Sequence, residues 1–222
     1  VSLNAQQYTG ELTYTYHGGV AVLALSPNSG PELGGTHVVV SGKELELGSH
    51  YVCRFNATVV PARGLDAQKM DCTSPPNGAG LAPVHVSLNA QQFVGNASVE
   101  TGFTYYAHSV VSEVSPTSGP RAGGTLVNVS GVGFADGSHY ICAFGAQLVP
   151  ASLAYSENAG AGGASVISCY SPAVAEGGGA PVALEVSLNA QQYTVEAHGF
   201  RYHGLPVVSG FSPSSGPSAG AT

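Results

Sequence analysis

Hydrophobic and polar residues alternate along the chain in short segments, and none keeps a helical period of about 3.6 residues for three turns. In residues 125–131, Val127 and Val129 fall on one face of an extended chain and Asn128 on the other. The same alternation occurs at 51–55. Gly-Pro and Gly-Gly pairs separate the segments and indicate turns. The pattern predicts an all-β fold of antiparallel two-sheet sandwiches with about seven strands each.

Three sequence markers recur along the chain and define internal repeats. They are VSLNAQQ at 1–7, 86–92 and 186–192, SPxSGPxxGxT at 26–36, 115–125 and 212–222, and GSHYxCxF at 48–55 and 137–144. Their spacing gives a period of about 85–100 residues, the size of a small sandwich domain. We therefore expect a longer natural molecule, of which this chain holds the C-terminal hairpin of a preceding repeat (1–19), two complete repeats (20–108 and 109–204) and the N-terminal part of a following repeat (205–222).

Two further features concern how a repeat closes and how it meets the next one. Asn89 is expected to be a left-handed turn residue that joins two antiparallel strands. Only eight residues lie between Tyr106 and Ser115, and Val110 and Val111 are among them. A linker so short and apolar predicts that neighbouring repeats dock and stack into a stiff rod.

Composition narrows the class of protein further. The 222 residues include 31 Gly and 14 Pro, only 9% are charged, and 13 acids against 6 bases give a net charge of −7. A hydrophobic fraction of 43% excludes wholesale disorder, and the lack of a three-residue Gly period excludes collagen. The chain lacks the basic stripe that a nucleic-acid partner needs. No apolar run reaches the ~18–20 residues needed to cross a bilayer, so no membrane span is expected in this segment.

The motifs follow a fixed order within each repeat. An SPxSGPxxGGT opening precedes a YxCxF strand, a second Cys shortly before Ser-Pro (Cys72 and Cys169), and a VSLNxQQ hairpin that closes on FTYY or FRYH. In this order they resemble IPT/TIG domains, the immunoglobulin-like modules of the plexin and transcription-factor type. Such modules occur in plexins, the hepatocyte growth factor receptor family and large surface proteins of unicellular eukaryotes. The resemblance covers essentially the whole chain and implies a binding or spacer unit without catalytic activity, although Asn-Ala stands where many relatives have Asn-Gly.

Each complete repeat contains two cysteines, and four cysteines allow three pairings. Repeat symmetry favours Cys53 with Cys72 and Cys142 with Cys169, because each module then carries its own disulfide. Buried free thiols are the alternative. Zinc is not expected, since closely spaced cysteine pairs are missing from the sequence.

Three Asn-x-Ser/Thr sequons begin at Asn56, Asn96 and Asn128. Asn128 is predicted to face outward from its strand, and Asn56 follows an inward Phe near a strand end, so both positions could carry a glycan. With the paired cysteines and the family resemblance, the sequons predict a secreted or cell-surface glycoprotein with covalent glycans and no other cofactor. The alternative is that all three are unmodified surface amides.

Motifs for catalysis or metal binding are missing from the sequence. The glycine runs at 160–163 and 177–179 lack the Lys-Ser/Thr of a phosphate loop, so we interpret them as loop insertions. His50 and His139 occupy equivalent places and are interpreted as packing or turn residues, because a second ligand at short spacing is missing. Asp136 followed by Gly resembles a fragment of a calcium loop, which leaves calcium at a domain junction as an alternative. We expect no enzyme activity and no metal.

The leading hypothesis is a non-enzymatic structural segment of an extracellular rod or filament, with neighbouring copies or repeats of the same protein as partners. The close similarity of the repeats, the short linkers and ends that fall within a repeat motivate it. The alternative is an adhesin or receptor ectodomain that binds a protein or glycan through one module face. That alternative predicts an aromatic or charged patch on one repeat only, and the insertion at 153–165 is its first candidate place. An accessory module of a carbohydrate-active enzyme is a third hypothesis.

Overall fold

The structure is a computed structural model that describes residues 5–6, 10, 14–16, 18–95, 102–155, 165–175, 180–196 and 198–218. All sixteen regular elements in these ranges are β-strands. No helix in the described ranges is long and apolar enough to cross a membrane. The expected all-β, tandem immunoglobulin-like fold is confirmed.

Eight strands belong to each repeat. The first contains β1 (Ala21–Ser26), β2 (Ser29–Pro31), β3 (His37–Lys43), β4 (Val52–Phe55), β5 (Thr58–Asp66), β6 (Lys69–Thr73), β7 (Gly80–Ser87) and β8 (Gly102–Tyr106). The second contains β9 (Val110–Ser115), β10 (Ser118–Pro120), β11 (Leu126–Val132), β12 (Ile141–Phe144), β13 (Gln147–Tyr155), β14 (Ser165–Tyr170), β15 (Val182–Ser187) and β16 (His198–His203).

Each repeat is one continuous ladder, with the order β1-β3-β6-β5-β4-β7-β8-β2 in the first repeat. The ladder can fold into two layers because β5 is shared: its first part pairs with β4 up to Pro61, and its second part pairs with β6 from Ala62 onward. The strand count exceeds the expected seven by one, and β2 runs parallel to β8. The additional strand is the three-residue Ser-Gly-Pro segment, which is too short to show any alternation in the sequence.

The core of each sandwich lies between the two layers. In the first repeat Val38, Val40 and Phe103 have no exposed surface, and the predicted inward positions Val127 and Val129 have none in the second. Edge-to-face ring pairs, Phe55–Phe103 and Phe144–Phe200, occupy matching places in the two cores. The predicted alternation is therefore confirmed, and it supplies the apolar surface that drives each repeat to close.

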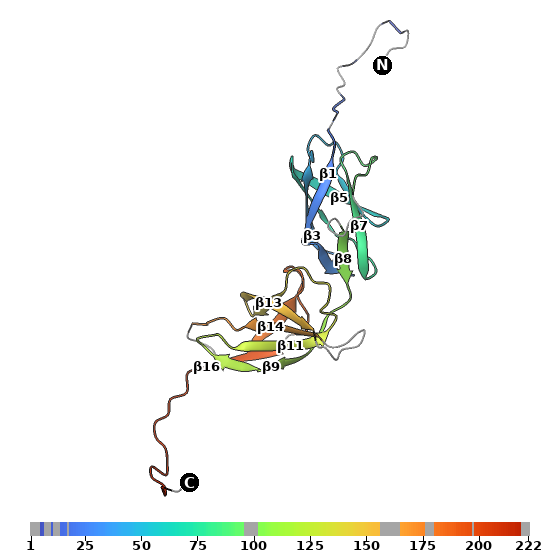
Figure 1. Cartoon of the computed structure of the whole chain (residues 1–222). Coiled ribbons are helices and arrows are strands. Elements are labelled where there is room, and N and C mark those ends of the chain that lie inside the picture. Colours follow the sequence, from blue (N-terminus) through green and yellow to red (C-terminus); the bar gives the residue numbers. More distant parts are fainter. Residues whose placement is uncertain are drawn as a thin grey trace.

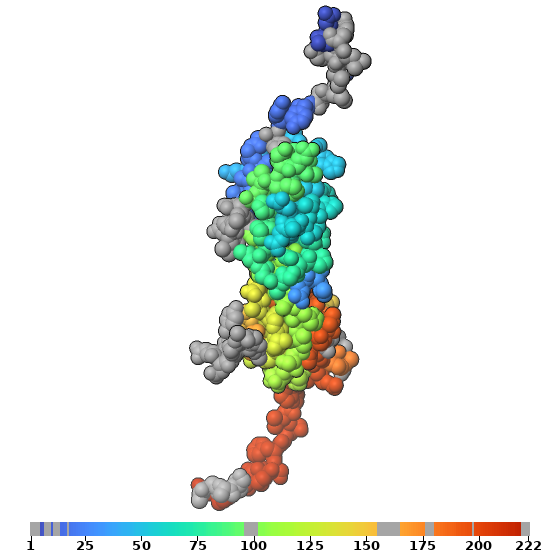
Figure 2. Space-filling view, turned by 90° about the vertical axis from the view of Figure 1, so that its right-hand side faces the viewer, coloured from blue at the N-terminus to red at the C-terminus, as the bar shows by residue number. Residues whose placement is uncertain are grey.

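The two repeats lie end to end, and the two chain ends leave from opposite ends of the molecule (Figure 1; Figure 2). Only residues 107–109 separate β8 of the first repeat from β9 of the second. Val110 and Val111 begin β9, and Val111 contributes to the second core. So short a connection brings the end of one sandwich against the beginning of the next.

Candidate functional site: the joint between the repeats

The second-repeat side of the joint is the loop at residues 187–192, here called the Asn loop. The Asn189 side-chain oxygen accepts hydrogen bonds from the backbone N–H groups of Gln191 and Gln192, both at 3.1 Å. Ala190 takes the left-handed conformation, with φ of 61°. The tight turn presents the two glutamine side chains toward the first repeat.

The prediction that Asn89 is the left-handed residue of the equivalent first-repeat turn was wrong. Ala90 has the positive φ, 58°, while Asn89 caps the turn with its side chain. An Asn side chain that hydrogen-bonds the backbone two residues on fixes such a turn without a left-handed φ of its own. Glycine in place of Ala90 would adopt this φ without steric cost.

The first-repeat side of the joint is formed by residues 29–37, here called the shelf. Its strand β2 is followed by a turn in which Gly34 has a φ of +75°. Gly30 lies directly under Thr36, since a Cβ atom on Gly30 would lie 2.2 Å from Thr36 Oγ1. These glycines allow the hydroxyl of Thr36 and the backbone of His37 to face the second repeat.

Among the described residues, seven hydrogen bonds join the second repeat to the shelf. The Gln191 amide pairs with the backbone of His37 in both directions: its Oε1 accepts from the N–H and its Nε2 donates to the carbonyl, each at 2.9 Å. The Gln192 amide donates to the Gly35 carbonyl at 3.1 Å and accepts from Thr36 Oγ1 at 3.0 Å. An amide side chain that satisfies a donor and an acceptor together fixes orientation as well as distance.

Asn189 and Thr36 form the buried centre of this contact, with 2% and 0% of their surfaces exposed. Asn189 Nδ2 donates to Thr36 Oγ1 at 3.2 Å and to the Ser29 carbonyl at 3.3 Å. The Ser29 hydroxyl donates to the Ser138 hydroxyl at 2.9 Å. Buried polar groups that are all paired rigidify a contact, because any opening leaves them without partners.

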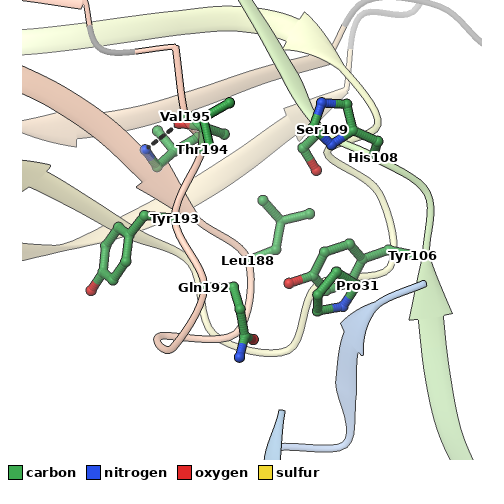
Figure 3. A pocket seen from close by; sticks show the side chains of 10 residues that line it. Pro31, Tyr106, His108, Ser109, Leu188, Gln192, Tyr193, Thr194 and Val195 are labelled. Atoms are coloured by element: carbon green, nitrogen blue, oxygen red, sulfur yellow. Dashed lines mark hydrogen bonds between the residues drawn. The ribbon is translucent and has the colours of Figure 1, made fainter. Parts of the chain in front are cut away.

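The apolar part of the joint is Tyr106, the last residue of β8. It is 6% exposed and packs into the hydrophobic core of the second repeat. Its ring also lines a small pocket of about 70 Å³ beside Leu188 and Gln192 (Figure 3). Burial raises the pKa of Tyr106, and the nearby Tyr140 of the second repeat raises it further, so the phenol stays neutral.

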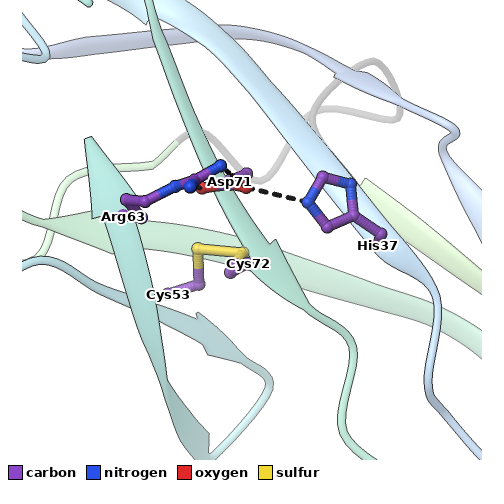
Figure 4. Close-up of a disulfide and its surroundings, with 5 residues drawn as sticks. All are labelled: His37, Cys53, Arg63, Asp71 and Cys72. Atoms are coloured by element: carbon purple, nitrogen blue, oxygen red, sulfur yellow. Dashed lines mark hydrogen bonds and ion pairs between the residues drawn. A yellow bond between two sulfur atoms is a disulfide. The ribbon is translucent and has the colours of Figure 1, made fainter. Parts of the chain in front are cut away.

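One side of the shelf continues into a charged cluster that only the first repeat has. His37 Nε2 lies 2.8 Å from the buried Asp71 carboxylate, and the Arg63 guanidinium donates to both Asp71 oxygens, at 3.1 and 3.3 Å (Figure 4). Burial alone would raise the pKa of Asp71, but the hydrogen bonds and charges of His37 and Arg63 outweigh it and lower the pKa. The second repeat has Leu126, Ser152 and Ser168 in these three places.

The cysteines form two disulfides, Cys53–Cys72 and Cys142–Cys169. Each lies within one repeat and connects strands on either side of the shared strand, β5 or β13, so it ties the two layers together. The first disulfide lies next to the Asp71 cluster (Figure 4).

Two of the three sequons lie in the described ranges. Asn56 is exposed in the turn between β4 and β5, and Asn128 is exposed on β11, where its Oδ1 accepts a hydrogen bond from the Ser168 hydroxyl at 2.8 Å. Asn96 lies outside the described residues. Occupancy of the sequons stays a prediction.

His50, His139 and Asp136, which were considered as metal ligands, each have a structural role in a turn or a backbone bridge. His50 and His139 form parallel bridges to Asn89 and Asn189, which places both at the base of an Asn loop. Asp136 has a φ of 64°, and its first-repeat counterpart Leu47 has 62°, so both serve the same left-handed turn. Among the described residues no group of three or more His, Cys, Asp or Glu is arranged to hold a metal. Both glycine runs, at 160–163 and 177–179, lie outside the described residues, as does most of the insertion at 153–165.

The short apolar linker predicted that the repeats dock, but the residues that form the joint were missed, although both of its halves are repeat markers. VSLNAQQ supplies the Asn loop and SPxSGPxxGxT supplies the shelf. The available signal was the recurrence of Gln and Thr at fixed places that neither the core nor the turns require, beside an Asn that also holds its own turn. Polar residues that recur in an array serve contacts between neighbours when they serve no contact within the repeat.

Two disulfide-clamped sandwiches docked end to end define a class of protein, a tandem array of immunoglobulin-like modules. The family model of the IPT/TIG domain matches residues 21–105 and 109–202. The chain therefore belongs to the IPT/TIG family, and the resemblance carried by the motifs is confirmed.

The segments that match this chain are short parts of much longer proteins. Human Fibrocystin-L is 28% identical over 209 residues, which is 92% of this chain and 5% of Fibrocystin-L. Mouse Plexin-A2 is 32% identical over 111 residues, which is 50% of this chain and 6% of Plexin-A2. The solved structure of the full extracellular region of plexin A4 matches with a TM-score of 0.57 and 19% identity, covering 85% of this chain and 16% of that chain. The structural match shows the fold, and the chain spans only a small fraction of each relative.

Proposed function

We propose that this chain is a non-enzymatic structural segment of an extracellular rod, in which IPT/TIG repeats hold a fixed mutual orientation. The observation that carries the proposal is the joint. Its central residues Thr36 and Asn189 are buried, and three residues of the Asn loop as well as Ser138 are hydrogen-bonded to the shelf. A flexible connection between binding domains would need neither buried amides nor a bidentate contact to backbone.

The extracellular part of the proposal is supported by the disulfides and by the relatives. Disulfides persist in oxidising compartments, and each repeat has one. The plexin A4 match is an extracellular region. Asn56 and Asn128 are both exposed, as attachment of a glycan requires. A mass decrease after peptide-N-glycosidase treatment of the natural protein tests this, and an unchanged mass would contradict glycosylation.

The rod proposal is tested by backbone ¹⁵N relaxation of the full chain. The two repeats are expected to tumble as one elongated body, with the same rotational anisotropy in both. The joint variant Gln191→Ala/Gln192→Ala is expected to separate the two tumbling times, whereas the matched variant Gln91→Ala/Gln92→Ala, in the equivalent first-repeat loop, is not. Independent tumbling of the repeats in the wild type would contradict the proposal.

A receptor or adhesin ectodomain is the second candidate, favoured by the cluster of His37, Arg63 and Asp71. This cluster is a charged patch present on one repeat and replaced in the other, as that hypothesis requires. Arg63 is 75% exposed at its side chain and can contact an acidic partner. Binding of the wild type to sulfated glycans, lost in Arg63→Ala and kept in Lys69→Ala, would favour this candidate. Equal binding by both variants would count against it.

A further inference from the structure

The sequence contains a single Asn-Gly pair, residues 77–78, in the loop at 74–79 between β6 and β7. Glycine has no side chain to shield its backbone nitrogen, and it reaches conformations that other residues rarely adopt. The nitrogen that follows an asparagine can therefore approach the asparagine side chain most easily when it belongs to glycine. The second repeat has Val174 and Ala175 in the corresponding places, so the pair belongs to the first repeat alone.

The loop is fixed on one side of Asn77 and open on the other. On the fixed side, the Tyr105 hydroxyl donates to the Pro75 carbonyl at 2.9 Å, and the Asn77 N–H donates to the Glu32 carbonyl at 2.9 Å. On the open side, Gly78 is exposed, and a Cβ atom built on it would meet no described atom within 4 Å. The main chain can therefore rotate at Gly78 while Asn77 stays in place.

Neither of the two groups is engaged elsewhere in the part of the chain that the structure describes. The side-chain amide of Asn77 and the N–H of Gly78 make no hydrogen bond there. By contrast, Asn89 and Asn189 hold their turns, each with a side-chain oxygen that accepts from two backbone N–H groups. The loop at 74–79 borders the shelf, so both repeats that could cover it are present in the structure, and Gly78 is still exposed. The pair is therefore accessible to water and free to react.

We propose that Asn77 is a site of spontaneous deamidation in the folded protein. Hydroxide removes the proton from the Gly78 nitrogen, which attacks Cγ of Asn77, so that a C–N bond forms and a cyclic imide closes. The side-chain nitrogen leaves as ammonia after taking a proton from water. Water then opens the imide at either carbonyl and leaves aspartate or isoaspartate, in which the main chain runs through the side-chain carbon. In sum, water is consumed, ammonia is released, and nothing is oxidised or reduced.

The modification changes both the charge and the backbone at the edge of the joint. It adds one negative charge to a chain whose net charge is already −7. Isoaspartate also lengthens the main chain between Asn77, whose N–H is held by Glu32, and Gly80, which pairs with Tyr105 at the start of β7. Because no enzyme or cofactor takes part, the modified fraction is set by time, temperature and pH. The reaction requires only this loop, so it occurs whether or not the repeats form a rod.

The test is incubation of the full folded chain at neutral and at mildly alkaline pH, followed by peptide mass spectrometry with fragmentation. A mass gain at Asn77 is expected to grow with time, and faster at the higher pH, and labelling by protein isoaspartate methyltransferase should detect isoaspartate there. Gly78→Ala is expected to slow the gain several-fold, because the added methyl group hinders the attack but meets no described neighbour in the fold. Gly19→Ala, at another exposed glycine with open space around its Cβ, is the control and is expected to leave the rate unchanged.

The Asp136-Gly137 pair is an internal reference, since aspartate forms the same imide by loss of water. There the Gly137 N–H donates to the Tyr140 hydroxyl oxygen at 3.0 Å, and Asp136 is held at a φ of 64°. Isoaspartate is therefore expected at 77 but not at 136 in the folded chain, and at both positions after unfolding in urea. A folded chain without a mass gain at 77, or equal rates in the wild type and Gly78→Ala, would overturn the proposal. Comparable isoaspartate at 136 in the folded chain would also overturn it, because the loop would then have no part in the reaction.

Discussion

Removal of the Thr36 hydroxyl measures how strongly the joint holds the two repeats together. Thr36→Val keeps the shape of the side chain but removes the donor to Gln192 Oε1, at 3.0 Å, and the acceptor for Asn189 Nδ2, at 3.2 Å. Since Thr36 and Asn189 are buried, the loss includes the cost of leaving amide groups poorly paired. We expect the free energy of opening the joint to fall by about 1–3 kcal/mol.

Thr125→Val is the matched control. Thr125 has the same local environment, because its N–H donates to Ser171 Oγ at 3.1 Å as the N–H of Thr36 donates to Ser74 Oγ at 3.1 Å. Thr125 is partly exposed, so the loss of its hydroxyl is expected to change stability by less than about 0.5 kcal/mol.

Hydrogen exchange under native conditions, followed at the His37 N–H that donates to Gln191 Oε1 across the joint, reports the free energy of joint opening in each variant. Asn189→Ala completes a double-mutant cycle with Thr36→Val, and a coupling energy of about 1 kcal/mol is expected because the two side chains share a hydrogen bond. The reasoning is refuted if the two changes add within about 0.3–0.5 kcal/mol, or if Thr125→Val and Thr36→Val have equal effects.

Three further outcomes are expected from particular residues. Because the folded-state pKa of Asp71 is lowered, its carboxylate stabilises the fold above its unfolded pKa of about 3.9 and loses that contribution as the pH falls through the folded-state pKa. Urea titrations at a series of acidic pH values should therefore show a fall in the free energy of unfolding in the wild type that is missing in Asp71→Asn. Replacing both Cys142 and Cys169, which are 27 residues apart, by serine should cost about 2–5 kcal/mol in the second repeat, and equal urea midpoints for variant and wild type would contradict this. Ala90→Gly should raise the free energy of unfolding by up to about 1 kcal/mol and so raise the melting temperature slightly. Glycine relieves the left-handed φ of 58°, and this gain exceeds the additional chain entropy that glycine loses on folding. A lower melting temperature would show that the turn does not strain alanine.

The fold was largely predictable because its signals are local. Alternation placed Val38, Val40, Val127 and Val129 inside, and each of them is fully buried. A side chain in a strand points to one of two faces, so burial of one face is readable from a few consecutive residues. The short strand β2 escaped prediction because three residues carry no periodicity, and its position depends on its parallel pairing with β8.

The joint was not predictable in the same way. The sequence shows that Asn, Gln and Thr recur, but the hydrogen bonds that join Asn189 to Thr36 connect residues 153 positions apart. Such a contact exists only after both sandwiches have closed and a three-residue linker has brought their ends together. The same reasoning applies to Asp71, whose partners His37 and Arg63 come from two different strands.

By itself, then, the sequence determined the repeat period, the all-β class, the inward face of each strand and the IPT/TIG family, because each of these follows from local pattern and recurring motifs. Only the tertiary structure decided what the recurring polar residues do. It shows the Asn loop of the second repeat buried against the shelf of the first. The physical reason is that a hydrogen bond between distant residues depends on the relative placement of two folded domains, which no local pattern records.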